Sequence, residues 1–317
     1  MSKRAIIIGA GLGGLLCARI LSRKGLDVTV LEAADVPGGL LHSVDWDGIP
    51  CEQGFHSVGG LAPGEALEKI FRPLGLMDLP WYRANVDEGF PFLRLNADSE
   101  LEKQHILHPY QQSVWRLKGG GDTLANALAE GLDIRYGKCV VSIDNQVITC
   151  GDNSSFEADV IIADLPPRQC LKLVKDHIRP SFIHRLDKLE TGRPIFTLYC
   201  LLEPGCVEWQ SGAIFLDGKL MIHFAEPETG ILELLCFGEE SPEKMLSLAR
   251  TRLPGLKVTK YRSALFPGYG ILKHTGTDYL SAKTPLPYLY LTGQNIGLHG
   301  ILGTAVSALN TCKSIRL

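Results

Sequence analysis

The first 32 residues of the chain hold an apolar run, a glycine-rich turn and a second strand-like run that ends on an acid. Residues 5–8 are continuously apolar, as expected for a strand that is buried on both faces of a parallel sheet. Gly9, Gly11 and Gly14 follow at the spacing where a tight turn, close approach to a pyrophosphate and close helix packing each require glycine. The pattern predicts a strand, a helix and a second strand around a dinucleotide site.

The same pattern supplies further candidate binding residues. Leu12 and Gly13 lie in the turn, where the N-terminus of the following helix would face phosphates with unpaired N–H groups. Glu32 ends the second predicted strand, where an acid accepts hydrogen bonds from ribose hydroxyls, and Ala33 follows it. Because the glycines stand between a strand and a helix, with Glu32 18 positions beyond Gly14, a glycine-rich turn without a ligand is disfavoured.

A second glycine pair, Gly38 and Gly39, follows the acid at short range, and a Gly-Phe-His segment then ends at His56. This arrangement resembles the flavoprotein superfamily of phytoene desaturases, retinol saturases and amine oxidases, in which FAD lies extended and a second glycine pair follows the ribose-binding acid. The resemblance implies FAD as the cofactor, in contact with Gly38, Gly39 and Leu40. Most relatives have Arg where this chain has Leu40, which removes any contact of that Arg and leaves the backbone contacts of the glycines.

The C-terminal segment resembles the same superfamily. Residues 288–292 are typical of a strand, and residues 300–309 of a helix rich in small residues. In relatives this helix points its N-terminus at the flavin, so the resemblance implies contacts from Gly293, Gln294, Gly300 and Ile301. A glycine-rich helix that serves only packing is the alternative interpretation.

Two central segments also match the superfamily. Residues 115–144 contain a glycine turn, a helix rich in Ala and Leu and a strand, and the resemblance implies that the backbone of Val140 faces the adenine. Residues 160–163 form an apolar run that ends at Ala163, before Asp164 and a pair of prolines, and match the strand that returns to the nucleotide domain. The segments occur in the order found in the superfamily, which makes them more specific together than singly.

We therefore expect an α/β protein with a Rossmann-like FAD-binding domain and an interleaved, smaller α+β substrate domain built on an antiparallel sheet. Three β-rich stretches separated by Gly, Pro and acidic turns indicate that sheet, and a helix opened by Ser241 and Pro242 follows them. The expected FAD-binding domain comprises residues 1–50, 110–170 and 262–317, and the expected substrate domain comprises residues 51–109 and 171–261.

Composition restricts the partners of the chain. A net charge of −3, with 21% charged residues, gives no general attraction to nucleic acid. Nine cysteines, an odd number without a Cys-x-x-Cys pair, favour free, buried thiols in a reducing compartment over disulfides or zinc. His105 and His108 stand three positions apart without a third ligand nearby, so no metal is expected.

The location predicted from the sequence is cytoplasmic. The first expected strand begins by residue 5, which leaves no room for a signal peptide, and no uncharged apolar run of about 18 residues predicts a transmembrane segment. Phe90, Phe92 and Leu93 leave two interpretations open, an apolar edge for peripheral membrane contact or a core strand.

The GFHSVGG and GQNIGLHG segments look closest to bacterial retinol saturase-like and carotenoid desaturase-like proteins. This resemblance implies an FAD-dependent oxidoreductase that moves a hydride between flavin N5 and a small hydrophobic, unsaturated substrate of isoprenoid or polyene type. A flavin amine oxidase that uses oxygen and a non-catalytic flavin-binding accessory protein are the alternatives.

Three residues are weak catalytic candidates, namely His56, Tyr269 and His299, because each stands beside a glycine-rich segment expected near the flavin. Each also has a purely structural interpretation. The sequence leaves open the direction of the reaction, the nicotinamide, quinone or oxygen that exchanges electrons, the oligomeric state, and whether a partner completes the short substrate domain.

Overall fold

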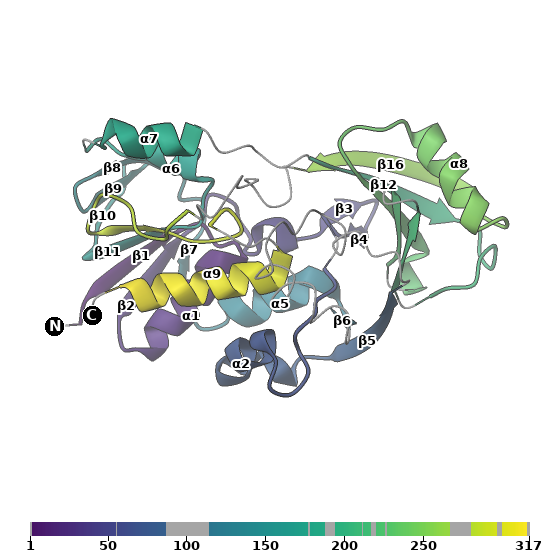
Figure 1. Ribbon diagram of the computed structural model, residues 1–317, viewed down its shortest axis with the longest axis horizontal. Coiled ribbons are helices and arrows are strands. Elements are labelled where there is room, and N and C mark those ends of the chain that lie inside the picture. The colour runs from purple at the N-terminus through teal and green to yellow at the C-terminus, as the bar shows by residue number, and fades with distance from the viewer. Residues whose placement is uncertain are drawn as a thin grey trace.

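The computed structural model describes residues 2–54, 56–86, 114–176, 178–187, 194–210, 212–216, 220–225, 227–266, 280–296 and 300–315. The described elements form two parts (Figure 1). A parallel sheet with helices on both faces lies at the end where the termini are, and a second, larger sheet with helix α8 (Pro242–Arg252) against it lies at the other end.

The parallel sheet has five strands in the order β17-β11-β1-β2-β7, and each neighbouring pair is parallel. The strands are β1 (Arg4–Ile8), β2 (Asp27–Leu31), β7 (Asp133–Arg135), β11 (Val160–Ala163) and β17 (Leu289–Leu291). The central position of β1 explains why its sequence is continuously apolar, since both of its faces are covered. The expected Rossmann-like α/β class is confirmed.

Alternate residues of β1 pack on opposite faces of this sheet. Ala5 and Ile7 contribute to a core shared with helices α1 (Leu12–Arg23), α2 (Ala66–Phe71), α5 (Gly120–Ala129) and α9 (Gly300–Ser314). Ile6 and Ile8 contribute to a core on the other face. The elements of that second face are β8 (Val140–Asp144), β9 (Val147–Cys150), β10 (Ser155–Glu157), α6 (Pro167–Leu173) and α7 (Pro180–Asp187).

Helix α9 is longer than the sequence suggested, because it continues past residue 309 to Ser314. Its buried face carries small residues at helical spacing, among them Ala305, Ala308 and Cys312, and this face packs along α1. The thiol of Cys17 in α1 lies 3.7 Å from the Ala308 carbonyl oxygen. The close packing that the small residues permit therefore extends over the whole length of the helix.

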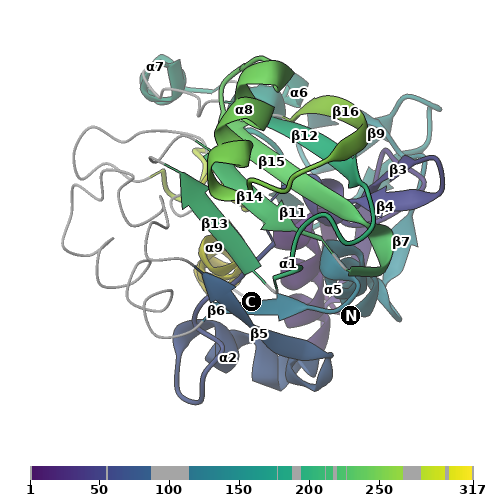
Figure 2. The same cartoon turned by 90° about the vertical axis from the view of Figure 1, so that its right-hand side faces the viewer.

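The second sheet has seven strands in the order β16-β12-β15-β14-β13-β5-β6. The strands are β5 (Trp81–Val86), β6 (Val114–Leu117), β12 (Ile195–Leu202), β13 (Gly212–Leu216), β14 (Leu220–Phe224), β15 (Ile231–Phe237) and β16 (Val258–Phe266). Neighbours are antiparallel except β13 and β5, so the antiparallel sheet expected from the sequence is present. Figure 2 shows α8 lying across it.

Helix α8 begins where the sequence placed it. The hydroxyl of Ser241 accepts a hydrogen bond from the backbone N–H of Lys244 at 3.2 Å, and Pro242 occupies the first helical position. Met245, Leu246 and Ala249 are buried against the sheet. A pair of prolines after β11 has a similar role, because Pro167 starts helix α6 in addition to ending the strand.

The proposed domain limits remain a prediction. Strand β6 pairs in the second sheet although it falls within residues 110–170, and β16 runs through the proposed limit at residue 262. Two smaller strands, β3 (Val44–Trp46) and β4 (Ile49–Cys51), form a hairpin that Figure 1 shows between the two parts.

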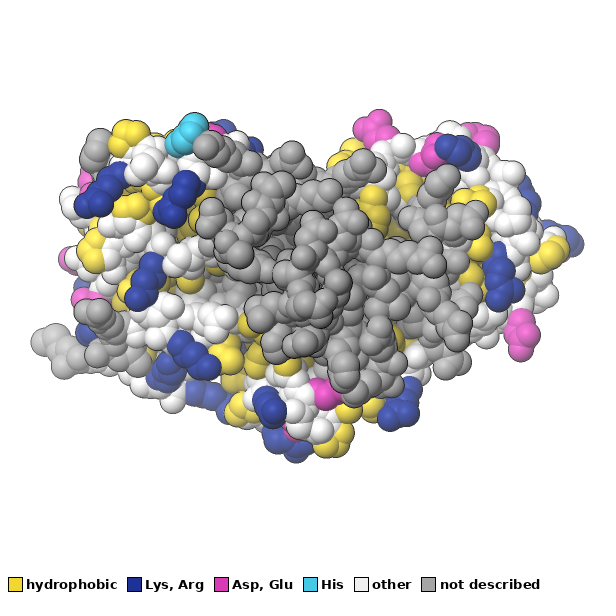
Figure 3. Space-filling model, viewed as in Figure 1, with side chains coloured by type: hydrophobic (Ala, Val, Ile, Leu, Met, Phe, Trp, Pro, Cys, Tyr) yellow, Lys and Arg dark blue, Asp and Glu magenta, His cyan; other side chains and the backbone are white. Residues whose placement is uncertain are grey.

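Three expectations from composition can be compared with the structure: the distribution of positive charge, the state of the cysteines and the length of the apolar helices. On the face in Figure 3, the described Lys and Arg side chains are spread around the molecule instead of forming one patch. All nine cysteines are free thiols, as the sequence predicted, but the expectation that they are buried is wrong for Cys139, which is exposed, and for Cys206 and Cys236, which are half-buried. Within the described ranges, no helix combines the length and apolar character needed to cross a membrane.

Candidate cofactor-binding site

A cavity of about 390 Å³ opens at the carboxyl edge of the parallel sheet. Its wall contains most of the predicted cofactor-binding residues, namely Gly9, Gly11, Leu12, Gly13, Glu32, Ala33, Gly38, Gly39, Leu40, Val140, Gln294, Gly300 and Ile301. The other three, Gly14, Ala163 and Gly293, lie behind this wall, where Gly293 is so close to Gly13 that a Cβ on Gly13 would lie 2.8 Å from its Cα. Segments far apart in the sequence therefore meet at one site.

The turn between β1 and α1 is built from glycines for two different reasons. Gly9 has a φ of +100°, in the left-handed region that favours glycine. Gly14 has an ordinary backbone conformation, but a Cβ there would overlap the carbonyl oxygen of Gly9. This packing brings the N-terminus of α1 against the strand, where Leu12 and Gly13 of its first turn line the cavity.

The carboxylate of Glu32 is held at the cavity wall by two backbone donors. Its Oε2 accepts a hydrogen bond from the N–H of Ala10 at 2.6 Å, and its Oε1 accepts one from Ala34 at 2.8 Å. A carboxylate has room for further donors on each oxygen. Glu32 is therefore oriented so that it can accept hydrogen bonds from ribose hydroxyls, as the sequence predicted.

We expect the substitution Glu32→Ala to weaken FAD binding by about tenfold to a hundredfold. Loss of a charged hydrogen-bond acceptor costs about 1.5–3 kcal/mol, and 1.4 kcal/mol corresponds to about a tenfold change in affinity. A fluorescence titration with FAD measures the effect, and Asp27→Ala at the exposed other end of β2 is the matched control. An unchanged dissociation constant in the Glu32 variant would remove this residue from the site.

Sequence reasoning missed the part that Asp164 has in this wall. Its Oδ2 accepts a hydrogen bond from the N–H of Gly14 at 2.8 Å, and a Cβ added at Gly11 or Gly13 would lie 2.8 Å from one of its carboxylate oxygens. Burial raises the pKa of Asp164 to about 6, with a further contribution from the nearby Glu32 carboxylate. The signal was an acid that ends a buried strand at the carboxyl edge of the sheet.

Another part of the cavity wall is formed by the start of α9 and by the turn after the second glycine pair. Gly300, Ile301 and Thr304 come from the first turns of α9, and Leu40 and Leu41 come from the turn after the glycine pair. Gly300 has a φ of +74°, so glycine suits the position where the helix begins. The helix N-terminus that the resemblance assigns to the flavin is thus in the cavity wall.

Among the three catalytic candidates, His56 lies in the cavity wall, whereas Tyr269 and His299 lie outside the described residues, as do Phe90, Phe92, Leu93, His105 and His108. The Nδ1 atom of His56 is 2.8 Å from Oε1 of Glu52. Its ring also bonds the carbonyl of Leu40. Both contacts fix the orientation of the imidazole, so His56 is held rigidly at this end of the site.

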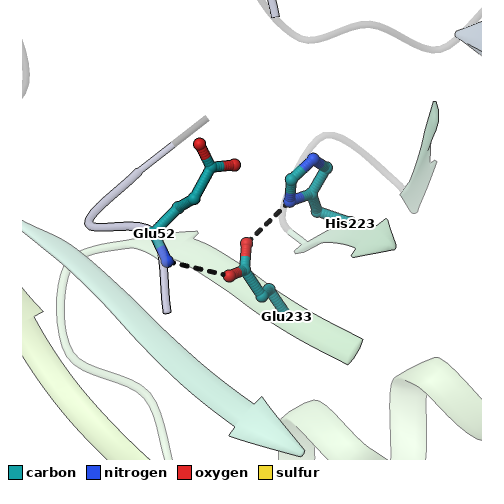
Figure 4. Close-up of side chains that lie close together, drawn as sticks. All are labelled: Glu52, His223 and Glu233. Carbon is teal, nitrogen blue, oxygen red and sulfur yellow. Dashed lines mark hydrogen bonds and ion pairs between the residues drawn. The ribbon is translucent and has the colours of Figure 1, made fainter. Parts of the chain in front are cut away.

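Glu52 connects His56 to a buried charge cluster at the second sheet. Oε2 of Glu52 is 3.5 Å from Nη2 of Arg116 in β6, and the backbone N–H of Glu52 donates to Glu233 in β15 at 3.3 Å. Glu233 also bonds Nδ1 of His223 in β14 at 2.6 Å. Figure 4 shows the Glu233 carboxylate between the other two residues. His223 and Glu233 are fully buried.

The charges within this cluster are set by pairing as well as by burial. Burial alone would raise the pKa of Glu52, but the neighbouring His56 outweighs it and the pKa is lowered to about 2. Burial would lower the pKa of His56, and the Glu52 carboxylate reverses this, so the pKa is raised. Burial and the charge of Glu52 raise the pKa of Glu233 well above its usual range. We interpret the cluster as an ionised Glu52 held by His56 and Arg116, with Glu233 protonated.

Ligand atoms of Glu52, His223 and Glu233 lie within 4.8 Å of one another, a spacing that metal ligands also adopt. Arg116 and His56 already neutralise Glu52, however, and a cation there would face a guanidinium group. We therefore treat the three residues as part of a hydrogen-bonded ion network.

The wall residues fit FAD. A Cβ on Gly39 would lie 3.3 Å from the Cα of Gly11, so the two glycine segments pack closely where both of them line the cavity. Glu32 and the first turn of α9 both line the cavity. Glu32 would hold the ribose, the N–H groups of α1 the pyrophosphate, and the start of α9 the flavin ring.

Comparisons with known proteins agree with this geometry. The family model for an NAD(P)-binding Rossmann-like domain matches residues 7–74, and that for a flavin containing amine oxidoreductase matches residues 72–195. Probable polyamine oxidase 4 of Arabidopsis thaliana is 39% identical over 109 residues, which are 34% of this chain and 20% of the relative. Hydroxyneurosporene desaturase of Rubrivivax gelatinosus is 43% identical over 53 residues, 17% of this chain and 10% of the relative.

Together these matches support the superfamily of FAD-dependent oxidoreductases. FAD is accordingly its cofactor. The matched stretches span a fifth or less of the length of these two curated relatives. Over the whole chain, an oxidoreductase from Methanosarcina mazei has the same fold, with a TM-score of 0.74 at 18% identity, covering 98% of this chain and 100% of that one.

Proposed function

We propose that this flavoprotein is an oxidoreductase that transfers a hydride between flavin N5 and a carbon of a hydrophobic, unsaturated substrate of isoprenoid or polyene type. The observation that carries the proposal is the composition of the cavity wall, which combines groups for ribose and pyrophosphate with apolar side chains and a buried histidine. FAD, when bound, supplies the hydride chemistry, whereas the chain supplies alignment and excludes water.

The apolar border favours an uncharged substrate. Leu40, Leu41 and Ile301 line the end of the cavity next to α9, and Leu41 and Ile301 are buried. Leu40 stands where the resemblance places an arginine in most relatives, so this position offers an apolar surface instead of a guanidinium group. A hydrocarbon chain gains free energy when it leaves water for such a wall.

His56 supplies positive charge at the same end. Its ring is held between Glu52 and the Leu40 carbonyl, and its raised pKa keeps the imidazole protonated to a higher pH than usual. A fixed cation stabilises negative charge that develops nearby during hydride transfer. His56 is therefore the described residue that we assign to electrostatic stabilisation and proton supply.

Amine oxidation with oxygen is the second candidate. It is favoured by the match to the flavin containing amine oxidoreductase model and by the similarity to a polyamine oxidase. The desaturase relative supports the unsaturated substrate instead. The same fold serves both chemistries, so the substrate decides between them.

Anaerobic mixing separates the two candidates. We expect photoreduced protein to be reoxidised by a polyene dispersed in detergent, or oxidised protein to be reduced by its more saturated form, with a product that differs by two hydrogens. Oxidised protein should remain unchanged with putrescine and spermidine. Reduction by an amine, with oxygen uptake when air is admitted, would favour the second candidate. A flavin that responds to neither class would favour the accessory protein.

A further inference from the structure

The N–H groups at the N-terminus of α1, where a helix can bind an anion, are hydrogen-bonded to the carboxylate of Asp164 in the same chain. Oδ2 of Asp164 accepts the Gly14 N–H at 2.8 Å, and the N–H of Gly13 also contributes a hydrogen bond to this carboxyl group. Gly13 and Asp164 both line the cavity, at the helix N-terminus to which the fold directs a dinucleotide pyrophosphate. One of the two anions must therefore give way to the other.

The backbone prevents Asp164 from moving far. Its N–H donates to the carbonyl of Ile8 at 2.9 Å, which continues the pairing of β11 with β1. Its carbonyl oxygen lies 2.9 Å from the position of a Cβ on Gly9. A carboxyl group one carbon away from this fixed backbone can rotate off the glycine N–H groups, but it remains beside the pyrophosphate.

We propose that Asp164 is a resident anion that the FAD pyrophosphate displaces, and that FAD binds with uptake of a proton by this carboxyl group. The proposal rests on FAD being the cofactor. In the cofactor-free protein the carboxylate satisfies N–H donors of α1 that would otherwise be unpaired. In the complex the pyrophosphate takes over those donors, and a neutral carboxyl group beside it avoids repulsion between like charges.

The charged and titratable groups around Asp164 favour the neutral form of its carboxyl group. Glu32, at the end of β2, adds negative charge and contributes to the raised pKa of Asp164. Lys138 lines the same cavity, but its ammonium group is bound to Asp152 and Ser154. Burial raises the pKa of the Cys17 thiol in α1, so this group stays neutral.

Three further segments lie near the carboxyl group. In α6, the guanidinium group of Arg168 bonds the carbonyls of Leu186 and Asp187 and lies 3.9 Å from the Asp187 carboxylate. The β1–α1 turn and the turn at Gly293 contribute no titratable side chain. Among the described residues, the immediate surroundings of Asp164 are therefore more negative than positive.

The pH dependence follows from the pKa of about 6 in the free protein. Below that pH the carboxyl group is already neutral and FAD binds without proton uptake. Above it, binding must protonate the group, because the phosphates raise the pKa further in the complex. The affinity of FAD should therefore fall by up to about tenfold for each pH unit above about 6.

An FAD titration of the flavin-stripped full-length protein tests the proposal. Flavin fluorescence would be followed from about pH 5.5 to about pH 8.5 for wild type, Asp164→Asn and Asp159→Asn. Asp159 is the matched control, because it precedes the same strand, is exposed and accepts a hydrogen bond from the Arg4 N–H at 2.8 Å. We expect wild type and Asp159→Asn to lose affinity as pH rises, and Asp164→Asn to bind at least about tenfold more tightly at about pH 8 with little pH dependence.

Calorimetry of the wild type keeps the test independent of any variant. Measured above about pH 7 in two buffers of different ionisation enthalpy, FAD binding should take up close to one proton per chain. The absence of proton uptake would overturn the proposal about Asp164 and leave the cofactor assignment intact. Affinities that are equal and independent of pH in wild type and Asp164→Asn would have the same consequence. Failure of all three proteins to bind FAD at any pH would overturn it together with the cofactor assignment.

Discussion

The substitution Gly11→Val is expected to give a folded protein that purifies without flavin. Gly11 has φ −71° and ψ 178°, an extended conformation that any residue adopts, so valine introduces no backbone strain. A Cβ at this position points toward the Asp164 carboxylate at 2.8 Å, within the groove between the two glycine segments. The branched side chain would fill the space of the pyrophosphate, and we expect a loss of FAD affinity of at least about a hundredfold.

A graded series controls this experiment. Gly11→Ala adds a single methyl group, which the Asp164 side chain can avoid by rotating, so its affinity should lie between those of wild type and Gly11→Val. Circular dichroism and thermal unfolding check that both variants fold. A valine variant that is as yellow as wild type would show that the pyrophosphate does not lie over Gly11.

The largest loss of stability is expected from Arg116→Met. The Arg116 side chain is buried, its Nη1 donates to the carbonyl of Phe224 at 2.7 Å, and its Nη2 lies 3.5 Å from Glu52. Methionine fills similar space but leaves Glu52 with one fewer positive partner, next to a second buried acid, Glu233. Removing one partner of a buried ion pair costs about 3–5 kcal/mol of unfolding free energy.

An exposed ion pair with the same separation provides the comparison. Arg4 lies 3.5 Å from Glu157 with both side chains more than half exposed. The substitution Arg4→Met should therefore change the unfolding free energy by less than about 1 kcal/mol. Urea unfolding of both variants measures the contrast. Equal, small effects would mean that the buried cluster tolerates the loss of Arg116, contrary to our account of its charges.

The cofactor half of the site was predictable because its signals are local. The glycine turn and the strand over residues 160–163 each depend on side chains within a few positions of one another. The cap at Ser241, in the other part of the molecule, was predictable for the same reason. Glycine at positions 9 and 14 follows from backbone conformation and from packing, both of which a short pattern specifies. For the same reason the sequence indicated how β1, α1 and β2 follow one another.

The buried cluster could not be predicted, because its contacts join distant positions. Glu52 meets Glu233 across 181 positions, and Arg116 reaches Phe224 across 108. Nothing local to any of these residues distinguishes it from a surface charge. Asp164 is an intermediate case, since its place at a strand end was visible, whereas its contact with Gly14 depends on β11 lying beside β1.

The central claim is that one cavity holds FAD with an apolar substrate beside it. The most direct test is an absorption spectrum of the freshly purified protein, followed by solvent extraction and mass analysis of everything released. We predict flavin absorption, equimolar FAD released without a covalent bond, and an apolar unsaturated molecule in the same extract. A colourless protein that takes up no FAD even at about pH 5.5, where its Asp164 carboxyl group is mostly neutral, would contradict the account.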